Sequence, residues 1–130
     1  MKSKFTFNYN SAYYPPAPFV DIVLVTPTEP LRTNVLHAFV DSGADGTIVP
    51  VRYLEAIQAP ATQEKFIRSQ WRERYRVMLF LVDVQIGDIT LPGIEVVGDE
   101  ISDEVVLGRN VLNRLRIILD GRKDIIEVSD

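Results

Sequence analysis

The sequence of 130 residues contains no cysteine and only one histidine, His37. Without cysteine the chain can form no disulfide, thiol nucleophile or thiolate metal site. One histidine and scattered acidic residues give no metal-ligand spacing, so we expect no metal and no other cofactor. A hydrolase built on Ser42 and His37 is disfavoured, because there is no Gly-x-Ser-x-Gly turn and no third partner is apparent.

Long apolar runs are also missing, since no segment approaches the ~20 apolar residues of a membrane span. The first eight residues contain two lysines but no apolar stretch behind them. They therefore predict no signal peptide. We expect a cytoplasmic protein with no membrane partner. The net charge of −4 provides no general attraction for nucleic acid.

One segment is locally basic, with arginines at positions 68, 72, 74 and 76. Glu64 and Glu73 interrupt the positive charge. We therefore interpret the segment as a solvated strand face and not as a nucleic-acid site. Trp71 lies in the same segment. A surface-anchored aromatic and a substrate contact are both open interpretations of Trp71.

The composition predicts one globular domain over residues 1–130, because 46% of the residues are apolar. Apolar runs of strand length are separated by proline, glycine, aspartate and asparagine, which favours a mainly β fold. Residues 1–18 are expected to be an extended lead-in. The Tyr-Pro-Pro-Ala-Pro run over residues 14–18 cannot form a helix or a central strand, because proline has no amide donor.

The apolar pattern predicts the order of the elements along the chain. Strands are expected over 19–26, 35–40, 47–50, 105–107, 117–119 and 125–128. Residues 64–86 should form a long hairpin or a bent pair of strands, and 89–97 a strand that Pro92-Gly93 interrupts. The clearest helix is expected over 110–115, because Val111, Leu112 and Leu115 would share a face; 51–58 is either a short helix or a turn. The sheet should be closed or strongly curved.

The most informative motif is Val40-Asp41-Ser42-Gly43-Ala44-Asp45, where an apolar strand runs into a turn. Asp and Gly favour turns, because an Asp side chain bonds its own backbone and Gly tolerates positive φ. The motif places a carboxylate at the end of a rigid, buried element, which makes Asp41 a candidate for proton chemistry. Taken alone, the tripeptide is also an ordinary turn after a buried strand. It occurs only once.

A second motif, Val105-Val106-Leu107-Gly108-Arg109-Asn110-Val111-Leu112, follows about sixty-five residues later. In this order and spacing the two motifs resemble those of the retropepsin-like aspartic proteases. The resemblance covers about residues 20–128 and is nearest to the stand-alone prokaryotic type. It implies a closed or curved barrel with one short C-terminal helix, active as a two-fold homodimer.

The resemblance implies a role for each residue of the first motif. Asp41 would be the catalytic aspartate. Ser42 stands where the family usually has threonine, and its hydroxyl would hydrogen-bond across the dimer axis. Gly43 would let the substrate backbone approach closely. Ala44 would complete the support of the active loop.

The second motif would hold the first in place. Asp45 and Arg109 resemble the family's internal ion pair, which ties the active loop to the helix. Gly108 directly precedes Arg109 of that pair, and Asn110 would help to begin the helix. These roles are structural and not catalytic.

A flap, which is a hairpin that closes over substrate, would fall near residues 66–80. Its tip would lie near Ser69-Gln70-Trp71-Arg72, and Ser69, Gln70 and Trp71 are the candidate substrate contacts. The sequence departs from the viral pattern here, because no glycine occurs between Phe66 and Phe80.

The expected chemistry needs two carboxylates that share one proton, so that one activates water and the other protonates the leaving amide. This chain supplies one such aspartate. The resemblance therefore implies an aspartic endopeptidase that acts on a peptide or protein substrate as a homodimer, with the two Asp41 side chains facing across a two-fold axis. The alternative is a catalytically silent binding or dimerisation module with the same fold.

Overall fold

The computed structural model describes residues 3–68 and 73–130, which form a mainly β fold. The chain order of its elements is β1 (Lys4–Asn8), β2 (Phe19–Val25), β3 (Leu36–Val40), β4 (Thr47–Pro50), α1 (Val51–Ala56), β5 (Ala61–Arg68), β6 (Arg74–Ile86), β7 (Ile89–Asp99), β8 (Val105–Leu107), α2 (Arg109–Leu112), β9 (Arg116–Asp120) and β10 (Ile125–Ser129). The expected mainly β fold is confirmed.

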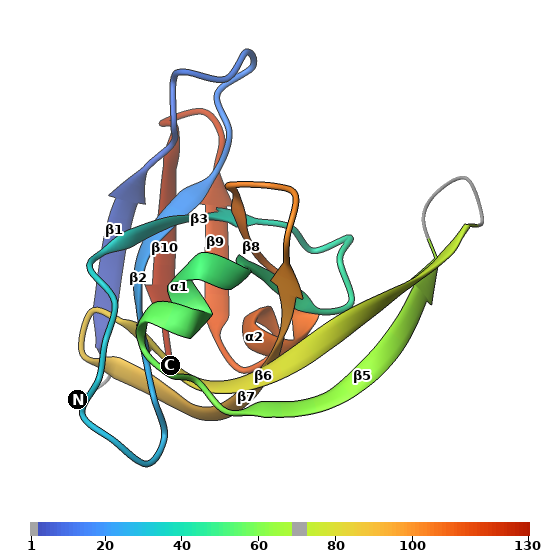
Figure 1. The fold of residues 1–130 in the computed structure, drawn as a ribbon. Helices are drawn as coiled ribbons and strands as arrows, with labels where there is room; N and C mark the ends of the chain where they lie inside the picture. Colours follow the sequence, from blue (N-terminus) through green and yellow to red (C-terminus); the bar gives the residue numbers. More distant parts are fainter. Residues whose placement is uncertain (1–2, 69–72) are drawn as a thin grey trace.

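Six strands close into a barrel (Figure 1). Their order is β2-β3-β8-β4-β7-β6, and β6 returns to pair with β2. Closure is possible because β2 divides its pairing: its first half pairs with β3 and its last three residues pair with β6. β5 pairs only with the outer part of β6, so these two strands form a hairpin that projects beyond the barrel.

The core consists of side chains that point into the barrel from alternate positions. On β6, Val82, Val84 and Ile86 are fully or almost fully buried, and on β2 the same is true of Ile22 and Leu24. This period of two matches the pleat of a strand with one buried face. The resulting apolar interior fixes the register of the strands that end at the candidate site.

A second sheet, β1-β10-β9, packs beside the barrel. Its strand β1 lies within the extended lead-in expected over residues 1–18, where no strand was predicted. Phe5 and Phe7 alternate with exposed Lys4 and Thr6, and both aromatic rings pack against the core. This alternation of apolar and polar residues is the pattern that predicts a half-buried strand.

Two expected elements differ from the structure. Strand β7 is not interrupted at Pro92-Gly93 but runs through it, with a shift of register between Val82 and Val84 of β6. Gly93 adopts a φ of +66°, and its N–H donates to Asp83 Oδ1 at 2.9 Å, which stabilises the irregularity. The helix predicted over 110–115 is wrong in extent: α2 covers only Arg109–Leu112.

Candidate active site

The active loop, residues 41–46, connects the end of β3 to the start of β4. Asp41 donates its backbone N–H to Leu107 O at 3.0 Å, so the neighbouring strand β8 fixes its backbone. Gly43 N–H donates to Asp41 Oδ1 at 2.9 Å, and Ala44 N–H donates to Asp41 O at 3.2 Å. The side chain of Asp41 is therefore held by its own turn. The hydrogen bond from Gly43 occupies only one of its two carboxylate oxygens. The turn positions the carboxylate at the molecular surface, where it is half-buried.

The small size of Gly43 matters for this geometry. A Cβ at Gly43 would lie 3.2 Å from Asp41 Oδ1, which is closer than ordinary contact. Gly43 and Ser42 are both exposed. The loop therefore presents open backbone beside the carboxylate, as an approaching ligand would require. The predicted hydrogen bond of the Ser42 hydroxyl across the dimer axis would involve a second copy of the chain, so it stays a prediction.

The second motif packs directly against the active loop. β8 runs parallel to β3, with Leu107 beside Val40, so Gly108 emerges next to the loop. A Cβ at Gly108 would lie 2.2 Å from Gly46 O and 3.0 Å from Ala44 O. These are backbone atoms that cannot rotate away. The two motifs therefore form one interlocked unit, and its close approach requires glycine.

We expect Gly108→Ala to destabilise the protein by about 1–3 kcal/mol, the usual cost of forcing a methyl group into a packed site. The free energy of unfolding, from urea titration, measures this effect. Gly46→Ala is the matched control, because a Cβ there meets nothing within 4 Å. Equal stability of the two variants would contradict the close approach.

Arg109 connects the start of α2 to the active loop through both its backbone and its side chain. Its N–H donates to Ala44 O at 2.9 Å, and its guanidinium Nη1 donates to Ser42 O at 2.9 Å. The guanidinium also forms an ion pair with Asp45. This pair lies at the surface, since the side chain of Arg109 is 43% exposed and that of Asp45 is 93% exposed. Its main effect is to brace the loop, because exposed pairs contribute little to stability.

Arg109→Ala should therefore reduce the free energy of unfolding by only ~0–1 kcal/mol. Amide exchange at Gly43 and Ala44 should accelerate nonetheless, because the loop loses its side-chain brace. Hydrogen exchange followed by NMR measures this local effect. Arg114→Ala is the control, since Arg114 also donates to a single carbonyl, Pro92 O at 3.2 Å, away from the loop. A loss of ~3–5 kcal/mol would instead indicate a buried charge pair.

Thr47 is a supporting residue that was not predicted from the sequence. It is fully buried at the start of β4. Its hydroxyl accepts from Gly108 N–H at 3.1 Å and donates to Asn110 Oδ1 at 2.8 Å. Asn110 in turn donates from Nδ2 to Glu95 O at 2.8 Å. The sequence offered one sign of this role, because Thr47 is a polar residue at the start of an otherwise apolar strand.

The loop between β7 and β8 is fixed on two sides before it leads into the second motif. Tyr13 donates its hydroxyl to Glu104 at 2.8 Å, and this hydrogen bond raises the pKa of Tyr13. Arg52 of α1 pairs with Asp103, which raises the pKa of the guanidinium. Both contacts are exposed, so we assign them a role in ordering the loop.

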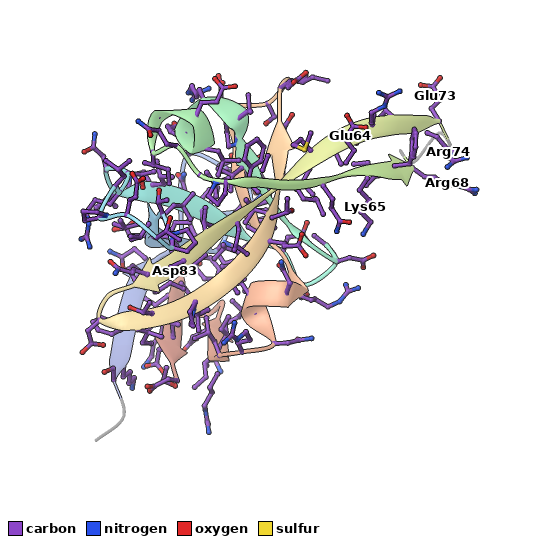
Figure 2. All side chains as sticks on the ribbon, turned by 60° about the horizontal axis from the view of Figure 1, so that its bottom comes forward. Glu64, Lys65, Arg68, Glu73, Arg74 and Asp83 are labelled. Carbon is purple, nitrogen blue, oxygen red and sulfur yellow. The ribbon has the colours of Figure 1, made fainter. Side chains whose placement is uncertain are left out.

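The hairpin of β5 and β6 lies where the flap was expected. Ser69, Gln70, Trp71 and Arg72 fall outside the described residues. Within them, charges of both signs follow the hairpin, as Figure 2 shows for Glu64, Lys65, Arg68, Glu73 and Arg74. The guanidinium of Arg74 lies 4.9 Å from the ring centre of Phe66. That of Arg76 lies 5.9 Å from the same centre and 3.7 Å from Glu64. These mixed contacts agree with a solvated strand face.

His37 does not join the site. It lies on β3 and contacts Asp21 of β2 at 2.7 Å, in an exposed position. The described residues contain no group of three or more histidine, aspartate or glutamate side chains arranged to hold a metal. Among the helices in the described part of the chain, none has the length and apolar character needed to cross a membrane.

Comparison with known proteins agrees with this geometry. No curated protein matches the chain. A retropepsin-like aspartic protease from Rickettsia conorii superposes with a TM-score of 0.64 at 15% identity, covering 99% of this chain and 92% of that one. The foamy viral protease–reverse transcriptase, solved with double-stranded DNA, gives 0.52 at 15% identity and covers 76% of this chain and 16% of that one. Residues 32–114, which include both motifs, match the family described as gag-polyprotein putative aspartyl protease. The chain therefore belongs to this aspartyl protease family, with a retropepsin-like fold.

Proposed function

We propose that the protein is a homodimeric aspartic endopeptidase that hydrolyses peptide bonds with water activated between two Asp41 carboxylates. The observation that carries this proposal is the placement of Asp41. Its carboxylate is fixed by Gly43 N–H and its backbone by Leu107, at the point where the two family motifs meet. Membership of the aspartyl protease family supports the same reaction class.

One Asp41 side chain cannot supply both proton transfers. In the dimer, the ionised carboxylate removes a proton from water while the oxygen of that water attacks the carbonyl carbon of the substrate. The protonated carboxylate gives its proton to the carbonyl oxygen. The carboxyl that took the proton from water then gives it to the amide nitrogen as the C–N bond breaks, and the other carboxylate takes a proton from the collapsing diol. Each such proton transfer typically contributes ~10²–10⁴ in rate.

The substrate would bind in an extended conformation between the active loops and the hairpins of β5 and β6. Extended peptides pair through their backbone, and alternate side chains then enter pockets on opposite sides. The open backbone at Ser42 and Gly43 fits this mode of binding. The roles of Ser42, Gly43, Ala44 and the flap tip remain proposals, and so does the cytoplasmic location expected from the sequence.

The test is cleavage of a peptide library by the purified protein, followed by mass spectrometry, beside the variant Asp41→Asn. Cleavage by the wild type alone would support the proposal. The second candidate, a binding or dimerisation module with this fold, predicts dimers without cleavage. Measuring the oligomeric state of the same preparation therefore separates the two.

A further inference from the structure

An apolar surface beside Asp41 lies on the outer face of the barrel wall. Its residues are register partners on five neighbouring strands, so their side chains share one face. They are Phe39, Val106, Ile48, Val97 and Leu79. All but Leu79 are partly exposed, whereas the strand neighbours that point to the other face are buried. The surface begins at Phe39, two residues before Asp41, and extends toward the hairpin of β5 and β6.

This apolar surface continues onto the hairpin. On the same face, successive pairs toward the tip are Leu79 with Gln63, Val77 with Lys65, and Tyr75 with Ile67. The pairing between these residues is regular, so the period of two keeps them on one face. Val77 and Ile67 are partly buried, and Lys65 is exposed. Lys65 is therefore the one charged side chain among these six residues.

The direction of the Lys65 side chain agrees with this register. Figure 2 shows Lys65 and Glu64 leaving opposite faces of β5, with Lys65 on the side where α2 and the active loop lie in this view. In Figure 1, the loop after β3 and the hairpin also project to the same side of the barrel. The ion pair of Glu64 with Arg76 belongs to the other face of the hairpin.

The positive charge of Lys65 is not neutralised by the described part of the chain. Within residues 3–68 and 73–130, no carboxylate lies within 4 Å of its ammonium group. The aliphatic part of a lysine can lie along an apolar neighbour, here Val77, while the ammonium group stays in water. A carboxylate bound over this surface would meet the ammonium group beside apolar side chains, where attraction is stronger than in bulk water.

We propose that Lys65 makes this enzyme selective for peptides that have an aspartate or glutamate among apolar residues near the cleaved bond. The inference rests on the proposed function and names its substrate class. An extended peptide places alternate side chains on the apolar surface, and an acidic one at the hairpin end meets Lys65. A lysine or arginine at the same position is repelled, so the selectivity has an attractive and a repulsive part.

The proposed dimer gives this selectivity a symmetry. Two copies of Lys65, related by the axis between the two Asp41 carboxylates, lie on opposite sides of the cleaved bond. The two preferred acidic positions should therefore lie at equal numbers of residues before and after that bond.

Cleavage of the peptide library by the wild type provides the first test. Aspartate and glutamate should be enriched at one such pair of positions. One cleaved peptide with a glutamate there is then compared with the same peptide containing glutamine. The ratio of their kcat/KM values should be about two- to fivefold in favour of glutamate, as for one exposed ion pair. The ratio should decrease as the salt concentration rises.

Variants of Lys65 test whether this residue is the cause. Lys65→Met should bring the ratio close to one, because methionine keeps the apolar part of the side chain without the charge. Lys65→Glu should reverse the preference, so that a peptide with lysine at this position is cleaved faster than the glutamate peptide. Lys123→Glu is the matched control, since it makes the same charge change in the exposed turn between β9 and β10 and should keep the wild-type ratio. Circular dichroism must show that each variant is folded.

Cleavage by the wild type without acidic enrichment would overturn the inference and leave the proposed function intact. So would a ratio that Lys65→Glu does not change. A second measurement does not depend on catalysis: peptides are selected from the same library by binding to Asp41→Asn protein, with and without Lys65→Glu. If acidic peptides are selected only where Lys65 is present but the wild type cleaves nothing, the proposed function fails and the selectivity stands. Selection without acidic enrichment would contradict the role of Lys65.

Discussion

Asp41→Asn is expected to abolish peptide cleavage, with a fall in kcat of at least about 10²–10⁴-fold. The amide cannot accept or donate the shared proton, so the site loses both the base and the acid of the reaction. The change is almost isosteric. The amide oxygen of the substituted side chain can still accept from Gly43 N–H, which preserves the turn seen in the wild type.

Stability and a matched substitution control this result. The melting temperature should change little, because no packing contact is lost. Asp88→Asn makes the same chemical change in the exposed turn between β6 and β7 and should retain full activity. Substantial cleavage by Asp41→Asn, in a preparation free of contaminating protease, would remove Asp41 from its catalytic role.

Activity is also expected to follow the concentration of dimer. A monomer has one Asp41 carboxylate and no partner to hold the second proton position. Specific activity should therefore fall on dilution below the dimer dissociation constant and recover on concentration. Analytical ultracentrifugation in parallel with the cleavage assay measures the dimer concentration and the specific activity of the same samples. Full specific activity from a demonstrated monomer would refute the paired-carboxylate mechanism.

Mixing experiments give a stricter form of this prediction. With a roughly ninefold excess of Asp41→Asn subunits, random pairing leaves roughly a tenth of the wild-type subunits in wild-type pairs. Activity per wild-type subunit should fall in the same proportion, because a mixed pair has only one carboxylate.

The sequence was sufficient to predict the mainly β barrel, and it also provides the two motifs that meet at the candidate site. β3, β4, β8 and β10 lie where apolar runs end in turn residues, because each strand is buried on at least one face. The two motifs are short, and each occurs once. Their meeting in space follows from the parallel pairing of β3 with β8, which the local pattern alone could not reveal.

Other features depend on tertiary contacts that no local pattern specifies. The exposure of the Arg109–Asp45 pair depends on how far the active loop stands out from the barrel. The buried hydroxyl of Thr47 is useful only because Gly108 and Asn110 arrive from a distant part of the chain. The length of α2 was overestimated because the spacing of apolar residues 111–115 suits a helix and also the turn that leads into β9.

The contact between the active loop and residues 107–110 has a consequence for synthesis. Leu107 is added to the growing chain about 3–13 s after Asp41, at elongation rates of about 5–20 residues per second. Until then Asp41 lacks the carbonyl that holds its backbone, and Ser42 and Ala44 lack the donors from Arg109. A chain still being translated therefore carries Asp41 before the contacts that order its loop are available, so the candidate site becomes ordered only late in synthesis.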